Sequence, residues 1–250
     1  MASGYSSVVL EHLTARWRNA PWCPEHSAFR FPMVSMTKAP PRCPIPASPL
    51  GFRSLSAPRW HQGKTSLVLG ATGITGKLAV KIAKLLGAGR VVAAGRNQQV
   101  LGTLHQFGAD ATIRLDLPAQ ELGEAFARAA GESGFQVVID YVWGQPTEIF
   151  LAATTRQEFA PVTSETRLVQ VGESAGPTIA LPAALLRSTA LTIFGTAGIP
   201  PRNILADALQ QVMAQAAAGE LRVDTERVPL ADIENAWQRD QQGRRLVIIP

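Results

Sequence analysis

Cysteine and histidine are scarce in this sequence, and their positions limit the chemistry that it can support. Of the 250 residues, two are cysteines and four are histidines. Both cysteines, Cys23 and Cys43, precede residue 63, and beyond that point His105 is the only residue of either type. Two cysteines do not form a disulfide framework, and a zinc site needs several thiolate or imidazole ligands. The sequence therefore predicts no metal centre.

Long hydrophobic runs and dense basic clusters are also missing. No apolar stretch reaches the roughly 18–20 residues that a membrane-spanning helix needs. Aromatic residues make up 6% of the chain, and beyond residue 63 the one pair of adjacent basic residues is Arg244-Arg245. Nucleic-acid-binding domains present a clustered basic surface, often with aromatic side chains that stack on bases. We therefore expect neither a nucleic-acid partner nor a membrane partner.

The composition changes abruptly near residue 62. Residues 1–62 hold nine of the 18 prolines, and their seven basic and two acidic residues account for the whole net charge of +5. Proline fixes φ and removes a backbone donor, so we predict a proline-rich, largely irregular and disordered extension over 1–62. Residues 63–250 carry 17 basic and 17 acidic residues and form the predicted globular domain. We expect a cytoplasmic protein. Arginine and serine with little acid are also typical of transit peptides, so organelle targeting by residues 1–62 is the alternative.

Three evenly spaced glycines follow a short apolar segment in LVLGATGITGKLAVKIAKLLG, residues 67–87. The apolar segment predicts a strand over 66–70, and the helical spacing of later apolar residues predicts a helix over 74–86. In a dinucleotide-binding turn, the first glycine allows a tight exit from the strand, the second the approach of a pyrophosphate, and the third close helix packing. The N–H groups that begin such a helix favour an anion. We predict cofactor contacts from Gly70, Ala71, Thr72, Gly73, Ile74, Thr75 and Gly76. The alternative is a plain strand-to-helix connection.

The second strand, VVAAGRN at 91–97, indicates which dinucleotide binds. NAD-binding turns usually place an acidic residue here to accept hydrogen bonds from the ribose. This sequence instead has Gly95, Arg96 and Asn97, so a small residue leaves room and a guanidinium can pair with a 2′-phosphate. We therefore predict a cofactor-binding role for these three residues and a roughly ten- to hundredfold preference for NADP(H). The alternative is a solvated arginine at a strand end.

Strands and helices continue to alternate along the chain. Further strands are expected over 111–114, 135–140, 167–171 and 191–195, and helices over 98–107, 120–130, 148–160 and 204–218. This alternation predicts an α/β protein with a doubly wound, six-stranded parallel sheet, the Rossmann fold. Ligands bind such sheets at the carboxyl ends of the strands. We therefore add Val142, Trp143, Gly172 and Glu173 to the cofactor site, with simple packing as the alternative for Trp143.

Three longer stretches carry a resemblance to a known family: residues 67–97, FGADATIRLD at 107–116, and VPLADIENAWQRDQQGRRLVIIP at 228–250. From about residue 63 to its end, the chain resembles the cofactor domain and C-terminal end of the medium-chain dehydrogenase/reductases. It is most similar to their zinc-free quinone-oxidoreductase branch. The resemblance implies a final helix and strand. It also implies contact of Arg244 or Arg245 with the pyrophosphate, with plain surface charges as the alternative. A homodimer formed through the strand at 191–195 is implied as well, and an inner strand would have the same apolar character. The N-terminal, barrel-like substrate domain of that family has no counterpart that we can align in residues 1–62.

These observations predict a zinc-independent oxidoreductase that moves hydride between NADP(H) and a small-molecule carbonyl, quinone or activated alkene. The sequence points to no catalytic acid or base. The alternative is a non-catalytic NADP(H)-binding remnant or redox sensor. A short-chain reductase would need a Tyr with Lys four residues later, whereas Tyr141 is followed at that offset by Gln145. Asp224 and Glu226 are expected as acids on an exposed strand.

Overall fold

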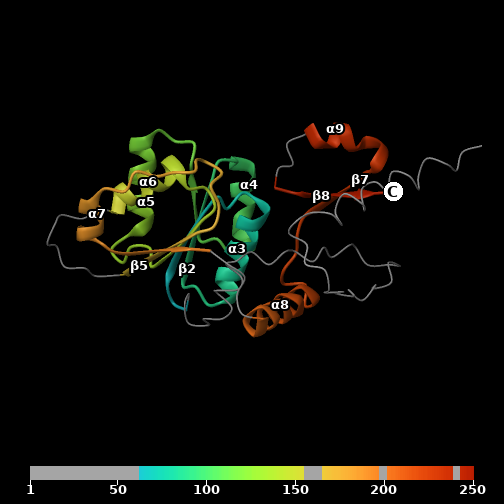
Figure 1. Cartoon of the computed structure of the whole chain (residues 1–250), viewed down its shortest axis with the longest axis horizontal. Coiled ribbons are helices and arrows are strands. Elements are labelled where there is room, and N and C mark those ends of the chain that lie inside the picture. Colours follow the sequence, from blue (N-terminus) through green and yellow to red (C-terminus); the bar gives the residue numbers. More distant parts are fainter. Residues whose placement is uncertain (1–61, 155–164, 197–201, 239–242) are drawn as a thin grey trace, which may run out of the picture. The chain divides into compact units, whose positions relative to one another are not determined.

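The larger of the two sheets in the described residues is parallel, with helices on both of its faces (Figure 1). The computed structural model describes residues 62–154, 165–196, 202–238 and 243–250, all within one of the two compact units of the chain, Arg42–Pro250. The predicted irregular extension and its boundary with the globular domain therefore lie almost entirely outside the described residues. The sheet has six strands in the order β3-β2-β1-β4-β5-β6, and every neighbouring pair is parallel. The predicted doubly wound sheet is confirmed.

The strands form where the sequence is apolar or β-branched. Strands β1 and β4 at its centre are almost completely buried, as expected of parallel strands that helices cover on both faces. The register pairs Leu67 of β1 with Val92 of β2 and with Val138 of β4. The six strands are β1 (Thr65–Leu69), β2 (Arg90–Gly95), β3 (Ala111–Arg114), β4 (Val137–Asp140), β5 (Glu165–Gln170) and β6 (Ala190–Gly195).

Two apolar clusters fill the space on the two faces of the sheet. One cluster joins helix α3 (Ile74–Leu85) and helix α4 (Gln98–Thr103) to the strands. The other joins helix α5 (Ala119–Ala130) and helix α6 (Gly144–Thr154), where the rings of Phe126 and Phe150 meet edge to face at 5.5 Å. In Figure 1 these two helix pairs lie on opposite sides of the strands. Each helix turns its apolar side chains inward at i, i+3 and i+4 spacing, which is why the sequence pattern predicted them.

Two helices differ clearly from their predicted bounds, and a third was not predicted. The helix expected over 98–107 ends as α4 at Thr103 and continues as a 3-10 turn, η1 (Leu104–Phe107). Helix α6 begins at Gly144 rather than residue 148, because a proline in the first turn needs no intrahelical N–H partner. Its predicted continuation to residue 160 lies outside the described residues. Helix α7 (Ala183–Ser188) has six residues and was not expected.

A second, smaller sheet belongs to the C-terminal part of the chain. Helix α8 (Arg202–Ala217) precedes it, close to the helix expected over 204–218. Strands β7 (Thr225–Pro229) and β8 (Arg245–Ile249) then pair in parallel. Between them lie a 3-10 turn, η2 (Leu230–Asp232), and helix α9 (Ile233–Gln238). Helix α9 and strand β8 match the helix and final strand that the family resemblance implied. Within the described ranges, no helix combines the length and hydrophobicity that crossing a bilayer requires.

Candidate functional site

The candidate site lies where the order of the strands reverses. Strands β1 and β4 are neighbours, but β2 follows β1 on one side and β5 follows β4 on the other. At such a switch point the loops after adjacent strands turn to opposite faces and leave a crevice at the carboxyl edge. All fourteen residues predicted to bind the cofactor lie at or just beyond the carboxyl ends of β1, β2, β4 and β5. Gly95 is the last residue of β2, and Ile74, Thr75 and Gly76 are the first residues of α3. The parallel sheet therefore brings them to one edge.

The turn after β1 is held tightly against β2. Gly70 has a φ of +85°, a conformation that glycine adopts at little cost. The N–H groups of Gly70 and Ala71 both donate to the carbonyl of Ala94, at 2.9 and 2.8 Å. Gly76 lies so close to β1 that an added Cβ would overlap the Gly70 carbonyl oxygen and lie 2.6 Å from the Cα of Ala71. The first and third glycines are therefore required by the turn itself.

Gly73 differs from Gly70 and Gly76, because the fold itself does not need a glycine at this position. Its backbone is extended, with φ −76° and ψ 165°, and an added Cβ would meet only the Gly70 carbonyl oxygen at an ordinary 3.6 Å. Gly73 and Thr75 are exposed. No side chain caps α3, and no acidic residue lies in its first turn. The first N–H groups of a helix have no intrahelical acceptor, so this end of α3 is suited to an anion that approaches along Gly73.

The last residue of β2 contacts this turn directly. A Cβ on Gly95 would overlap the Cγ2 atom of Thr72 and lie 2.8 Å from its hydroxyl oxygen. The absent side chain at Gly95 thus makes space for Thr72, a reason that the sequence did not reveal. Arg96 is exposed, and its guanidinium forms no hydrogen bond or ion pair with the part of the chain that the structure describes. It is available to a ligand at this edge.

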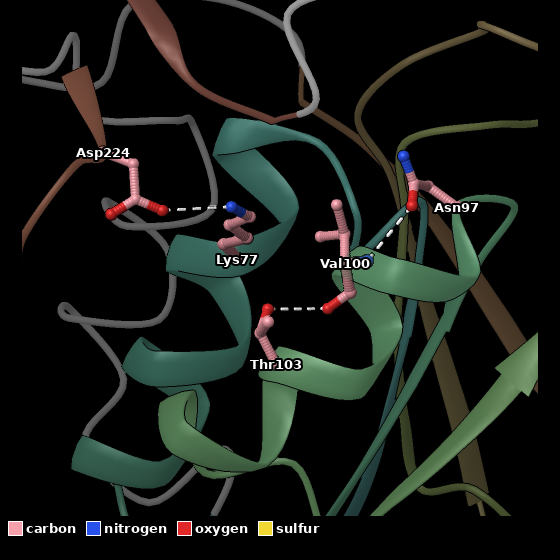
Figure 2. Close-up of polar contacts among 5 residues, drawn as sticks. All are labelled: Lys77, Asn97, Val100, Thr103 and Asp224. Carbon is pink, nitrogen blue, oxygen red and sulfur yellow. Dashed lines mark hydrogen bonds and ion pairs between the residues drawn. The ribbon is translucent and has the colours of Figure 1, made fainter. Parts of the chain in front are cut away.

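Asn97 has a structural role beside its predicted one. Its side-chain oxygen accepts a hydrogen bond from the N–H of Val100 at 3.1 Å and so caps the start of α4 (Figure 2). The Thr103 hydroxyl donates to the Val100 carbonyl at 2.7 Å one turn later. The cap uses one lone pair of the Asn97 amide oxygen, and the amide nitrogen can still donate to a cofactor.

Asp140, the last residue of β4, organises the third loop. It is fully buried, and its carboxylate accepts from the N–H groups of Val142 at 2.8 Å and Trp143 at 2.9 Å and from the Thr147 hydroxyl at 2.6 Å. Burial raises the pKa of Asp140, although these three donors favour its ionised form. Sequence reasoning missed this residue. The signal that could have found it is an acid that ends an otherwise apolar strand, FQVVID.

Trp143 is placed by this network. It has a φ of +55°, which is uncommon for a residue other than glycine, and the Asp140 carboxylate holds its N–H. Its side chain packs against the apolar cluster on the α5 and α6 face of the sheet. Val142 is buried and its Cγ1 lies 3.0 Å from a Cβ built on Gly70. The two residues thus lie beside the turn. Trp143 makes a packing contact, as the alternative to cofactor binding had it.

The loop after β5 is bonded to the loop after β4. The N–H of Ala175 donates to the Val142 carbonyl at 2.7 Å, and the Ser174 hydroxyl donates to the Tyr141 carbonyl at 3.2 Å. A Cβ on Gly172 would lie 2.7 Å from that same Tyr141 oxygen, so only glycine fits. Glu173 is exposed. Contacts therefore run without a break across the site, from Gly95 through the turn to the loops after β4 and β5.

Comparison with known proteins places this site in a family. The sequence profile described as zinc-binding dehydrogenase matches residues 75–214, which is more than half of the chain. The chain belongs to the zinc-binding dehydrogenase family. The expected membership of the medium-chain dehydrogenase/reductase superfamily is thereby confirmed for the cofactor-domain part of the chain.

Relatives of this zinc-binding dehydrogenase chain include quinone reductases. It is 29% identical over 198 residues to a probable NADPH-dependent quinone reductase of Emericella nidulans, a match that covers 75% of this chain and 54% of the relative. The Thermus thermophilus quinone oxidoreductase, solved also with NADPH, is 25% identical with a TM-score of 0.59, covering 82% and 64%. The Escherichia coli quinone oxidoreductase in complex with NADPH is 21% identical with a TM-score of 0.62, covering 81% and 63%. The chain thus spans about half to two thirds of these relatives.

The zinc in the family's description has no matching ligand set here. Residues 75–214, the part that matches the profile, contain no cysteine and one histidine, His105. Its Nδ1 atom lies 2.8 Å from the carbonyl oxygen of Ala109, within hydrogen-bond distance. Among the described residues, no three His, Cys, Asp or Glu side chains are grouped so that they could hold a metal ion. These residues therefore do not fit a zinc site.

Proposed function

We propose that this chain binds NADP(H) and takes part in an oxidoreductase reaction of the quinone-reductase type. The observation that carries the proposal is the turn between β1 and α3. At Gly73 the fold itself would leave room for a Cβ atom, so the glycine is not needed for packing. The helix that follows begins without a side-chain cap, at the switch point of the sheet. A pyrophosphate fits these features, because an anion gains from the helix N–H groups and needs a close backbone approach.

Each loop of the site would hold a different part of the cofactor. The turn at Gly73 and Thr75 would hold the pyrophosphate, and the loops after β4 and β5, with Val142, Trp143 and Gly172, would border the nicotinamide. The bound cofactor would supply the hydride, and the protein would supply orientation and electrostatics. Asp140 keeps the loop after β4 in place through its three hydrogen bonds, so it acts as a positioning residue.

The preference for NADP(H) over NAD(H) would rest on Arg96. Its exposed guanidinium follows β2 directly, where the adenosine ribose binds in dinucleotide-binding folds. A 2′-phosphate accepts two parallel hydrogen bonds from a guanidinium, which a plain ribose hydroxyl cannot do. The relatives that carry NADPH in their names support the same cofactor for this chain.

The proposed acceptor is a quinone, a carbonyl or an activated alkene, reduced without zinc. Zinc independence is supported by the side chains of the described residues. Zinc that polarises an acceptor is held by several His, Cys, Asp or Glu ligands, and the described residues do not group such side chains. The chain spans 54% of its quinone-reductase relative, so activity of the chain by itself is part of the proposal. The alternative, an NADP(H)-binding sensor without turnover, uses the same site.

One pair of measurements tests the proposal. Titration of the full chain with NADPH by calorimetry should give saturable binding, and NADPH absorbance should then fall when a quinone or an enal is added. Oxidation of NADPH above the protein-free background supports the oxidoreductase. Binding without oxidation supports the sensor, and no binding overturns both.

Two further proposals concern assembly and location. Strand β6 pairs only with β5 among the described strands, so its other edge could pair with the same edge of a second copy, and light scattering after gel filtration would report a homodimer. The expected cytoplasmic location is testable by fluorescence microscopy of the full chain with a C-terminal tag.

A further inference from the structure

Helix α3 carries three lysines, and each one pairs with a carboxylate from another part of the chain. Lys77 pairs with Asp224 at 3.1 Å, Lys81 with Glu220 at 3.0 Å, and Lys84 with Asp110 at 2.7 Å. The first two partners belong to one segment, which leaves α8 and leads into β7. Two ion pairs thus hold residues 220–224 along α3, with the later residue nearer to the dinucleotide-binding turn.

The Lys77–Asp224 pair differs from the other two in its surroundings. The Lys77 side chain is 9% exposed, against 28% for Lys81 and for Lys84. Lys77 directly follows Gly76, the last glycine of the turn. Figure 2 shows its ammonium extending from α3 to the Asp224 carboxylate. The same ammonium also lies 5.8 Å from the centre of the Phe107 ring. A buried charge is costly without a partner, so Asp224 is held to this position.

The backbone of Asp224 is also hydrogen-bonded to the first residue of strand β8. Its carbonyl accepts the N–H of Arg245 at 2.7 Å. Two residues earlier, Gly243 has a φ of +73°, and a Cβ there would lie 2.8 Å from the Thr72 carbonyl oxygen and 3.1 Å from the Lys77 nitrogen. The residues that lead into β8 therefore pack directly on the dinucleotide-binding turn. The contacts form a closed ring that runs from the turn to Lys77, Asp224 and Gly243 and returns to the turn at Thr72.

From this ring we infer that Lys77, Asp224 and Gly243 form a C-terminal latch that sets the affinity of the turn for NADP(H). The inference rests on the proposed function and names positioning residues for it. The Asp224 carboxylate is directed to Lys77 rather than to the cofactor edge, so it acts by holding Gly243 against Thr72. Binding and latch closure are then coupled, and each strengthens the other by the same factor.

The chain offers a matched control for this inference. Asp224→Asn and Glu220→Gln each neutralise one carboxylate that pairs with a lysine of α3, and the two acids are similarly exposed, at 54% and 49%. Only the first is part of the latch. With the full chain, calorimetric titration should show the Kd for NADPH raised about fivefold in Asp224→Asn and unchanged in Glu220→Gln. Asp224→Glu keeps the charge and should restore most of the affinity.

The outcomes separate this inference from the proposed function. If the wild type binds no NADPH, the proposed function fails and the latch with it. If the wild type binds and the two neutralised variants have equal Kd values, the latch alone is refuted, because a purely structural ion pair lowers the melting temperature without changing Kd. Should Asp224→Asn not fold, hydrogen exchange of the wild type decides. NADPH should slow exchange in residues 243–249 but not in α5, and equal exchange with and without NADPH overturns the inference.

Discussion

The three glycines of the turn make a sharp test, because two of them face different constraints. We predict that Gly76→Ala destabilises the fold, whereas Gly73→Ala leaves stability almost unchanged and impairs NADPH binding. A methyl group at Gly76 would overlap the Gly70 carbonyl oxygen and lie 2.6 Å from the Cα of Ala71. These are backbone atoms and cannot move aside like the end of a side chain. A methyl group at Gly73 meets only an oxygen at 3.6 Å.

The magnitudes follow from these contacts. Overpacking costs about 1–3 kcal/mol, and the upper part of that range applies to Gly76 because α3 as a whole must shift. The better helix propensity of alanine returns up to ~1 kcal/mol. A net loss of about 2 kcal/mol corresponds to a fall in melting temperature of roughly 4–8 °C for a domain of this size. At Gly73 the weaker capping of alanine and the lower entropy of its unfolded chain nearly cancel, within about 0.5 kcal/mol.

Thermal unfolding with and without NADPH separates the two effects. At a hundredfold excess over Kd, the cofactor should stabilise the wild type by about 2.7 kcal/mol, or roughly 5–10 °C. Gly73→Ala should keep the melting temperature of the cofactor-free protein. If the methyl group raises Kd at least tenfold, it removes about 1.4 kcal/mol of that stabilisation. An unchanged NADPH shift in a fully stable Gly73→Ala protein would refute the assignment of the pyrophosphate to this turn.

Three other predictions test the remaining loops. Arg96→Ala should weaken NADPH binding roughly ten- to hundredfold and leave NADH binding nearly unchanged, and calorimetric titration with both cofactors checks this. Gly95→Ala should destabilise by about 1–3 kcal/mol through its overlap with Thr72. Thr72→Ala in the same chain should restore most of that loss in denaturant unfolding, whereas additive losses would show that the two residues do not compete for space. Asp140→Ala removes the acceptor of three hydrogen bonds and should cost about 2–4 kcal/mol, while Asp140→Asn should cost much less. Because burial raises the pKa of Asp140, its stabilising contribution is complete below the unfolded value of 3.8 and is lost as pH rises through the raised pKa. The stability of the wild type relative to Asp140→Asn should therefore decline as the pH rises above 3.8, and a flat difference would contradict this.

The sheet and most of its helices could be predicted because their signals are local. Apolar runs such as residues 66–70 and the 3.6-residue spacing in 74–86 report which faces are buried, whatever the rest of the chain does. The glycine spacing also predicted the turn, since tight turns and close packing restrict the residue type at single positions. The start of α6 was predicted four residues too late, although a first helical turn accommodates the proline at position 146.

What the sequence by itself determined is therefore the α/β class, the parallel sheet and the loops that gather at one edge. Only the tertiary structure decided which side chains of those loops contact one another. Asp140 binds the N–H groups of its own loop, Gly95 makes space for Thr72, and Asp224, expected as a solvated acid, pairs with Lys77 from a helix 147 residues earlier in the chain. The physical reason is range. Backbone preference and hydrophobic periodicity act over a few residues, whereas ion pairs, close contacts and buried hydrogen bonds join residues that only the completed fold brings within a few ångströms of each other.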